Sequence, residues 1–386
     1  MIPYGRQSLD KSDEEAVLEV LRSDWLTQGP TVTHFEQALS EQCAGAAAVA
    51  VSNGTVALTL ACQALGLGPG GRLWTSPNTF VASANCGRYC GAEVGFVDID
   101  LETGNMSVEA LERALQDAER SGTLPDIVIP VHFAGLPCAM EKIARLGKRY
   151  GFRIIEDACH AVGASLNGDP VGDCRYSDAT VFSFHPVKII TTGEGGAILC
   201  RDSALETRLR LLASHGITRD PEQMHESAVD DPWYYQQVTL GVNARITDLQ
   251  AALGVSQMRR LRHFVQRRER LAARYDDAFE DLPLHLPWRG ETMASAWHLY
   301  VIRIDADRTP IDRREAFLAL RERGIGVNVH YIPVHTQPYY RARGFSDGDF
   351  PNAEQHYRQC ITLPLFPAMR DDEQARVITA VKEIFS

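Results

Sequence analysis

The sequence predicts an α/β protein with a central, mostly parallel sheet covered by helices and a smaller C-terminal α+β domain. Seven short β-rich runs alternate with helix-like segments in the first 200 residues, the pattern of parallel strands joined by crossover helices. Beyond them the alternation ends. With 386 residues, 45% of them apolar, the chain can bury a large core, and its length is more typical of two domains than of one.

Local patterns predict the individual elements. Thr33 and Glu36 form a capping-box pattern, and Phe35 and Leu39 then share one helical face, so we predict a helix that begins at Thr33. The β-rich runs predict strands at residues 48–51, 72–76, 94–98, 127–131, 153–155, 180–184 and 197–200.

A long helix is predicted to join the two domains. Residues 247–279 have helical apolar spacing, many Arg, Glu and Ala residues and no internal proline. We therefore predict a large domain with an N-terminal arm over residues 1–250, and the linking helix with the small domain over 251–386. Further patterns predict a strand at 299–304, helices at 313–323 and 371–385, and a polar, acidic loop at 219–231.

Composition excludes several kinds of function. The formal charge of −11 is spread along the chain without a dense basic stretch, so nucleic acid is not an expected partner. The nine cysteines are scattered without a CxxC pair, and neither a signal-peptide pattern nor an apolar span of membrane length is present; we expect reduced thiols in a cytoplasmic protein. GxxxxGK[ST], HExxH and a GxGxxG after a strand are also missing, so we expect no metal or dinucleotide site.

Lys188 points most directly to a chemistry. It follows a predicted buried strand, and residues 191–196 after it form a flexible, hydroxyl-rich turn that suits a lysine directed inward. Burial lowers the pKa of a lysine and exposes its nucleophilicity, so Lys188 is a candidate Schiff-base amine for an aldehyde cofactor. The alternative is a solvated surface lysine.

Asp157 follows another β-rich run, and open α/β sheets place ligand-binding groups beyond the carboxyl ends of their strands. Its carboxylate is a candidate partner for the ring nitrogen of pyridoxal phosphate, which it would keep protonated. His160 is a candidate partner of the ring hydroxyl, and Phe80 is a candidate for stacking on the ring. The alternative for Asp157 is a turn cap or a pair with a nearby arginine; for His160 it is a structural histidine, and for Phe80 a core phenylalanine.

A phosphate cradle is predicted where the first strand meets the next helix. The N–H groups of Gly54 and Thr55 point outward at the positive end of an Ala/Leu-rich helix, and the hydroxyls of Thr55 and Ser183 add contacts. An ordinary helix cap is the alternative for this turn. An amine, an anion, a ring platform and a phosphate cradle together predict a pyridoxal phosphate enzyme.

Taken together, these residues resemble the DegT/DnrJ/EryC1/StrS family of sugar-nucleotide aminotransferases, and the resemblance covers nearly the whole chain. It is carried by residues 26–30 (LTQGP), 53–55 (NGT), 156–160 (EDACH), 183–188 (SFHPVK), 241–248 (GVNARITD) and 251–254 (AALG). It implies fold type I of the pyridoxal phosphate enzymes, the aspartate aminotransferase fold. It also implies Lys188 as the catalytic lysine, Asp157 at the ring nitrogen, and Asn243 at the phosphate of the neighbouring subunit's cofactor, in a homodimer with shared active sites.

Within that family the chain is most similar to the aminotransferases of pseudaminic acid biosynthesis, through residues 183–188, 232–235 and 329–335. This implies transfer of an amino group from L-glutamate, through pyridoxamine phosphate, to the C4 ketone of UDP-4-keto-6-deoxy-N-acetyl-L-altrosamine, for a surface glycan such as that of flagellin. One departure is the pair Val242 and Ala244, because many relatives carry an aromatic residue beside the asparagine.

Four further side chains are candidate substrate contacts. The resemblance implies that His185, His330 and Tyr331 contact the sugar nucleotide. Arg245 is a candidate clamp for a carboxylate or phosphate because its planar fork binds such anions through two hydrogen bonds, and a salt bridge is its alternative.

Other functions stay open at this point. One is an aminotransferase for a different ketone, such as a UDP-4-keto-pentose, GDP-4-keto-6-deoxymannose (the perosamine type) or a dTDP-keto-sugar. A dehydratase that uses pyridoxamine phosphate is disfavoured by Lys188, because such relatives carry histidine there. The third is a regulator that binds the cofactor without catalysis.

Overall fold

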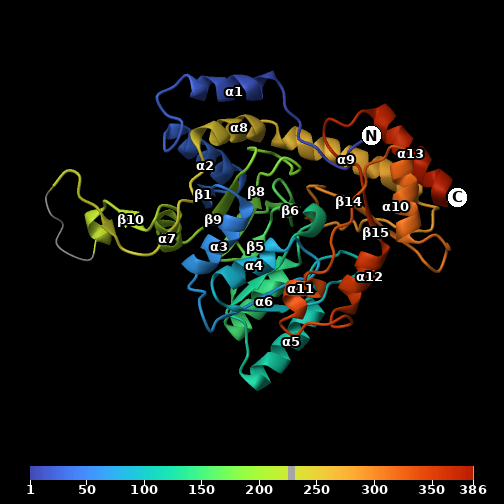
Figure 1. Cartoon of the computed structure of the whole chain (residues 1–386), viewed down its shortest axis with the longest axis horizontal. Helices are drawn as coiled ribbons and strands as arrows, with labels where there is room; N and C mark the ends of the chain where they lie inside the picture. Colours follow the sequence, from blue (N-terminus) through green and yellow to red (C-terminus); the bar gives the residue numbers. More distant parts are fainter. Residues whose placement is uncertain (225–230, 386) are drawn as a thin grey trace.

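The computed structural model describes residues 1–224 and 231–385, and its main body is a seven-stranded sheet in the order β1-β9-β8-β5-β4-β2-β3 (Figure 1). Only β9 runs antiparallel to its neighbours, β1 and β8, and all other neighbouring strands are parallel. The predicted mostly parallel sheet is confirmed. Its strands are β1 (Ala47–Val51), β2 (Arg72–Thr75), β3 (Glu93–Phe96), β4 (Ile127–Ile129), β5 (Arg153–Asp157), β8 (Ala179–Ser183) and β9 (Gly196–Cys200).

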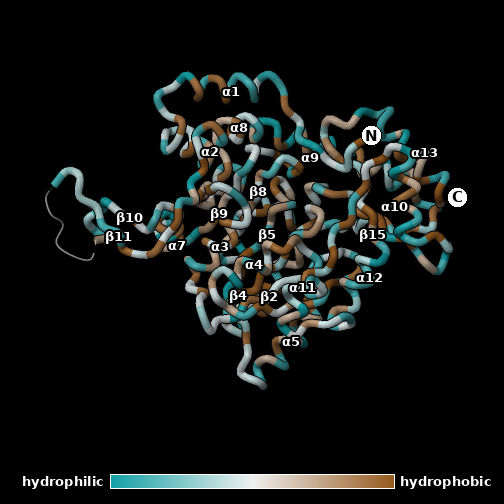
Figure 2. The backbone as a smooth tube through the Cα atoms, in the orientation of Figure 1, coloured by the Kyte–Doolittle hydropathy of each residue, from teal (hydrophilic) through white to brown (hydrophobic). Residues whose placement is uncertain are grey.

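Helices cover both faces of this sheet because its side chains alternate between them. In β1, Val49 and Val51 pack with one set of helices, and Ala48 and Ala50 pack with the other. The first set is α3 (Gly54–Ala64), α4 (Ala82–Tyr89) and α7 (Ser203–Ala213); the second is α2 (Pro30–Gln42), α5 (Val108–Ser121), α6 (Met140–Tyr150) and α8 (Asp248–Met258). Figure 2 shows the apolar strands at the centre and hydrophilic segments around them.

The C-terminal part has its own apolar core. Strand β14 (Tyr300–Ile304) lies between β12 (Leu284–His285) and β15 (Cys360–Leu363), antiparallel to both. Helices α9 (Leu261–Phe279), α10 (Arg313–Glu322) and α13 (Asp371–Phe385) pack on this core, while α11 (Pro338–Arg341) and α12 (Pro351–Gln359) lie between it and the large sheet. The predicted boundary at residue 250 falls within α8, and the division into two domains stays a prediction.

The N-terminal segment links the two parts of the molecule. Ile2 forms a parallel bridge with Ile325 of the C-terminal part, and the chain then crosses to α1 (Lys11–Leu21), which packs on α8 (Figure 1). Helix α1 was not predicted, although Asp10 and Asp13 form a capping box at its start.

Two predicted helix boundaries are wrong. Helix α2 begins at Pro30 rather than Thr33, because buried Asp248 accepts hydrogen bonds from the N–H groups of Gly29 (2.8 Å) and Thr31 (3.0 Å) and so caps the helix from another part of the chain. The predicted helix over 247–279 is two helices, α8 and α9. Arg260, at the break between them, forms ion pairs with Asp10 and Asp13 of the α1 cap.

Short strands complete the fold. The hairpin of β10 (Ile217–Thr218) and β11 (Gln236–Gln237) projects from the body beside α7 (Figure 1). The predicted loop at 219–231 lies between them, and its residues 225–230 lie outside the described residues. A small sheet joins β6 (Ser165–Leu166) with β7 (Asp169–Pro170) and β13 (Met293–Ala294).

Within residues 1–224 and 231–385, no helix combines the length and the apolar character that crossing a membrane requires.

We predict that Asp248→Ala lowers the free energy of unfolding by about 3 kcal/mol, because it leaves two N–H groups at the start of α2 without their charged acceptor. Asp248→Asn, which keeps one acceptor oxygen, is expected to lose about half as much. Chemical denaturation measures both. The control is Asp277→Ala on the exposed face of α9, with a change within about 0.5 kcal/mol. Equal stability of Asp248→Ala and Asp277→Ala would contradict the assigned cap.

Candidate active site

A cavity of about 830 Å³ lies at the carboxyl edge of the sheet. Asn53 and Gly54 follow β1, Thr79 lies in the segment after β2, Asp157 ends β5 and Ser183 ends β8. Since these four strands run in the same direction, their carboxyl ends meet at one edge, where open α/β sheets bind ligands. Residues 328–331 of the C-terminal part close the cavity from the other side.

The turn between β8 and β9 brings Lys188 into this cavity. The N–H of Phe184 donates to the carbonyl of Gly195 (2.9 Å) and the N–H of Thr192 donates to the carbonyl of Phe184 (3.0 Å), so the turn closes on itself at its base. Gly193 has φ 79°, a left-handed conformation that glycine adopts readily. Strands β8 and β9 are consecutive and antiparallel, so the chain between them reverses direction without a crossover helix.

The amine of Lys188 has no hydrogen-bond or ion-pair partner within the described residues. Burial lowers its pKa, and the nearby Cys159 and Asp157 only partly oppose this effect. The site therefore favours the uncharged, nucleophilic form of the amine more than water does.

Asp157 is buried and held on both carboxylate oxygens. Its Oδ2 accepts from the hydroxyl of Ser83 (2.6 Å) and its Oδ1 accepts from the N–H of Cys159 (3.2 Å). The side chain also lines the cavity, so acceptor directions remain for a ligand there.

The aromatic side of the cavity is formed by His160, His298, His330 and Tyr331. The ring of His160 lies 4.3 Å from that of His298 (centroid to centroid), and its Nε2 lies 3.1 Å from the Tyr331 hydroxyl. Burial lowers the pKa of His160 and of His298 well below the usual range, and the charge of Lys188 adds to it. Burial likewise lowers the pKa of His330, to about 3. These imidazoles are neutral at neutral pH.

The start of α3 fits a phosphate group. The Asn53 side chain caps the N–H of Val56 (2.9 Å), which leaves the N–H groups of Gly54 and Thr55 without an acceptor in the described structure. The hydroxyls of Thr55 and Ser183 also lack protein partners there, and all three residues line the cavity. A Cβ at Gly54 would lie only 2.9 Å from Cβ of Ser183, so glycine keeps this cradle open. Four donors at a helix N-terminus suit a dianion.

The structure brings most of the predicted site residues together, but not all of them. The cavity lining includes Gly54, Thr55, Phe80, Asp157, His160, Ser183, His185, Lys188, His330 and Tyr331. Asn243 and Arg245 do not line it: Asn243 is exposed beside Ser214, and Arg245 donates to the hydroxyl of Ser214 (3.0 Å). Their predicted roles therefore require a second chain or a different ligand position.

Sequence reasoning missed several lining residues, among them Tyr4, His298 and Ser83. Tyr4 and His298 reach the cavity from distant parts of the chain, and Ser83 reaches Asp157 from inside α4. The one available signal was His298, a polar residue within the apolar run 296–302. Tyr4 and Ser83 carry no such signal, because tyrosine and serine occur commonly in these contexts.

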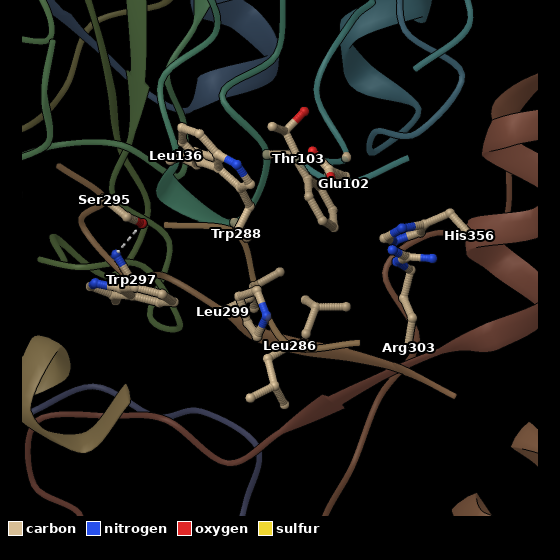
Figure 3. Close-up of a pocket in the computed structure, with 15 residues that line it drawn as sticks. Glu102, Thr103, Leu136, Leu286, Trp288, Ser295, Trp297, Leu299, Arg303 and His356 are labelled. Atoms are coloured by element: carbon tan, nitrogen blue, oxygen red, sulfur yellow. Dashed lines mark hydrogen bonds between the residues drawn. The ribbon is translucent and has the colours of Figure 1, made fainter. Parts of the chain in front are cut away.

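A second, much smaller cavity lies between the large sheet and the C-terminal part (Figure 3). Trp288, Arg303 and His356 are among the side chains around it, and its volume is about 40 Å³. That is space for a few water molecules, so it does not compete as a site for a sugar nucleotide. Within the described residues, no cluster of three or more His, Cys, Asp or Glu side chains is arranged to hold a metal ion.

The α/β fold, a cavity lysine at the carboxyl edge of the sheet, a buried carboxylate and an open phosphate cradle define an enzyme of the pyridoxal phosphate-dependent class. Comparison with known proteins is more specific. A model of the DegT/DnrJ/EryC1/StrS aminotransferase family matches residues 7–382, and the chain belongs to this family. It is a pyridoxal phosphate-dependent sugar aminotransferase, as the sequence predicts.

Relatives match along the full length of the chain. The spore coat polysaccharide biosynthesis protein SpsC of Bacillus subtilis is 39% identical over 99% of this chain and 97% of its own. The structure of PseC of Helicobacter pylori, an aminotransferase of pseudaminic acid biosynthesis, has a TM-score of 0.90 at 30% identity and covers 100% of this chain and 99% of its own. Spr1654 of Streptococcus pneumoniae in its PMP form has a TM-score of 0.88 at 28% identity, covering 100% and 99% of the two chains.

We predict that the rate at which the Lys188 amine reacts with pyridoxal phosphate rises with pH to a plateau, with its midpoint below the ordinary lysine pKa of about 10.4. Only the unprotonated amine attacks the aldehyde, and burial lowers the pKa at which it forms. The visible absorbance that develops after pyridoxal phosphate is added to the apo-protein measures the rate, with Lys188→Ala as the blank. A midpoint at or above about 10.4 would show that Lys188 is solvated.

Proposed function

We propose that this enzyme transfers the amino group of L-glutamate to the C4 ketone of a nucleotide-linked deoxysugar, with UDP-4-keto-6-deoxy-N-acetyl-L-altrosamine of pseudaminic acid biosynthesis as its favoured substrate. The observation that carries the proposal is the convergence of Lys188, Asp157 and the α3 cradle on one cavity that is large enough for a cofactor and part of a substrate. The structural similarity to PseC supports the substrate.

Bound pyridoxal phosphate supplies an aldehyde that takes up the amino group and a protonated ring that withdraws electrons. The chain's own residues then have distinct tasks. Lys188 would supply the nucleophilic amine through Nζ, and the same atom would carry a proton as general acid and base. Asp157 holds a proton at the ring nitrogen, and the N–H groups of Gly54 and Thr55 bind the phosphate with Ser183.

The aromatic side chains of the cavity have three proposed tasks. His160 hydrogen-bonds the ring hydroxyl, and Tyr331, 3.1 Å from its Nε2, fixes the orientation of the imidazole. Phe80 is 59% exposed despite lining the cavity, and it stacks on the cofactor ring when the ring is present. His185, His330 and Tyr331 contact the sugar nucleotide.

The identity of the sugar rests on the comparisons. PseC matches this chain at 30% identity, whereas SpsC, a spore coat polysaccharide protein, matches at 39%. Both names concern sugars, and the second keeps a different keto-sugar nucleotide open as the substrate.

A shared active site is proposed to complete the phosphate cradle. Asn243 is exposed and lies outside the cavity of its own chain. Its surroundings expose large apolar side chains, which monomeric proteins seldom gather on one segment: Ile217, Trp233, Tyr235, Leu240 and Val242. A second copy of the chain on this surface would bury them and bring Asn243 to the partner's cofactor.

We predict that L-glutamate removes the visible absorbance of the bound cofactor and that a keto-sugar nucleotide restores it. Lys188→Ala is expected to lower turnover at least about a thousandfold, because it removes both the nucleophile and the proton carrier. Lys142→Ala, at an exposed lysine of α6, is the matched control and keeps wild-type turnover. A wild-type protein whose absorbance ignores glutamate is instead a non-catalytic cofactor binder.

The substrate is tested with a panel of ketones. We expect kcat/KM to be highest for UDP-4-keto-6-deoxy-N-acetyl-L-altrosamine among this sugar, a UDP-4-keto-pentose, GDP-4-keto-6-deoxymannose and a dTDP-keto-sugar. Faster turnover of any of the others would overturn the pseudaminic acid assignment and leave the aminotransferase assignment intact.

Mixed dimers test the position of Asn243. The dimer of interest has one Lys188→Ala chain and one Asn243→Ala chain. If Asn243 acts on the partner's cofactor, one site of this dimer combines the intact Lys188 of one chain with the intact Asn243 of the other. Random mixing of the two chains then gives about a quarter of wild-type activity, because half of the dimers carry one intact site of two. If Asn243 acts within its own chain, the mixture is no more active than the two variants apart.

A further inference from the structure

The segment before α4 and the first turn of that helix bring two buried hydroxyl groups to the cavity. Ser83 is completely buried and Thr79 is 3% exposed. The hydroxyl oxygens of Thr79 and Ser83 lie 2.7 Å apart, and the Ser83 oxygen lies 2.6 Å from Oδ2 of Asp157. Both residues line the cavity, but neither belongs to the amine, the carboxylate or the phosphate cradle.

The direction of these hydrogen bonds follows from the number of protons. The Ser83 hydroxyl has two acceptors within reach, Oδ2 of Asp157 at 2.6 Å and the carbonyl oxygen of Phe80 at 3.3 Å. An ionised carboxylate only accepts, so the single proton of Ser83 is donated to the closer, charged acceptor, Asp157. The Ser83 oxygen is then free to accept from Thr79, which has its own hydroxyl proton. The result is a directed chain in which Thr79 donates to Ser83 and Ser83 donates to Asp157. Donation to a carboxylate makes the last bond charge-assisted, which fits its short length.

These two hydrogen bonds fix the orientation of the Asp157 carboxylate. The terminal torsion of an aspartate has a broad energy well, so the side chain needs partners to fix the carboxylate plane. The N–H of Cys159 holds Oδ1 from the following backbone at 3.2 Å, and Ser83 holds Oδ2 from α4. With one donor on each oxygen, the remaining lone pairs point in a fixed direction, and Asp157 presents them where it lines the cavity.

We propose that Ser83 is a positioning residue: its hydroxyl, oriented by Thr79, holds the Asp157 carboxylate in the direction that the ring nitrogen of the cofactor requires. The inference rests on the proposed role of Asp157. Residues 79–83 then act on the cofactor ring in two ways. Ser83 acts through Asp157, and Phe80, which lies between Thr79 and Ser83 in the sequence, stands exposed in the same cavity. A shift of this turn moves the ring platform and the carboxylate partner together.

Ser83→Ala tests the proposal through the affinity for pyridoxal phosphate, measured by equilibrium dialysis, and through the unfolding temperature of the apo-protein. We expect the Kd to rise about tenfold, as loss of a hydrogen bond to a charged group predicts, and Thr79→Val to raise it about threefold. The matched control is Thr75→Val. Thr75 is also completely buried, but its hydroxyl donates to the carbonyl of Ile129 (2.8 Å), away from the cavity.

The control separates positioning from general packing. Thr75→Val is expected to lower the unfolding temperature of the apo-protein and leave the Kd unchanged, whereas Ser83→Ala changes the Kd. An unchanged Kd in Ser83→Ala would overturn the proposal, and so would an equal rise of the Kd in Thr75→Val. Thr79→Val, which keeps the size of the side chain, gives the same information if Ser83→Ala does not fold.

A double-mutant cycle with Asp157→Asn shows which assignment fails. If Ser83 acts through Asp157, adding Ser83→Ala to Asp157→Asn changes the Kd by less than about twofold. A full tenfold addition would place the effect of Ser83 elsewhere and overturn its role. If Asp157→Asn itself binds like the wild type, the role of Asp157 in the proposed function is wrong. A weakened Asp157→Asn beside an unaffected Ser83→Ala refutes the positioning role alone.

Discussion

The parallel pairing of β5 with β8 is the constraint on which the site depends. In its register Asp157 lies opposite Val181, so β5 ends at the carboxylate while β8 continues for two residues to Ser183. The chain then reverses into β9, and the turn of this reversal carries Lys188 back over the end of β5. This one register thus places three groups around the same cavity: the amine of Lys188, the carboxylate of Asp157 and the Ser183 hydroxyl of the cradle. A slip by one residue would send Asp157 to the opposite face of the sheet.

The opposite face has its own carboxylate. Glu156 precedes Asp157, and strand alternation directs it away from the cavity, where its Oε2 lies 2.7 Å from Nε2 of His132 and its Oε1 accepts from Ser177 (2.5 Å) and Thr180 (3.2 Å). Burial raises the pKa of Glu156, but these hydrogen bonds outweigh it and hold the pKa below its usual value. His132 also donates its backbone N–H to the carbonyl of Asp157 (3.0 Å). The network beneath the sheet therefore anchors the strand end that carries the site.

The sequence predicted the parts of the site that depend on local order along the chain. Asp157 and Ser183 lie at strand ends and Lys188 lies in the turn after one of these strands, and the order of strands and turns that places them is visible in the composition of short segments. Contacts between segments that are far apart in the sequence could not be predicted from these local patterns. Asp248 caps α2 across more than two hundred residues, which overrode the local capping pattern at Thr33, and Arg260 turned toward α1 where the sequence predicted an unbroken helix. The link from Ser83 to Asp157 was missed for the same reason.

The cradle at the start of α3 consists of N–H groups and hydroxyls, and Lys188 is the single lysine or arginine among the described residues around the cavity. Burial holds three of its histidines, His160, His298 and His330, in the neutral form. An anion at the cradle thus binds to N–H and hydroxyl dipoles that the fold has already oriented, rather than to mobile lysine or arginine side chains. Such dipoles do not titrate near neutral pH, and a buried site is screened less by salt than an exposed ion pair is. Within one chain, the binding of a phosphate is therefore set by the geometry of the start of α3, separately from the proton transfer proposed for Lys188 in the same cavity.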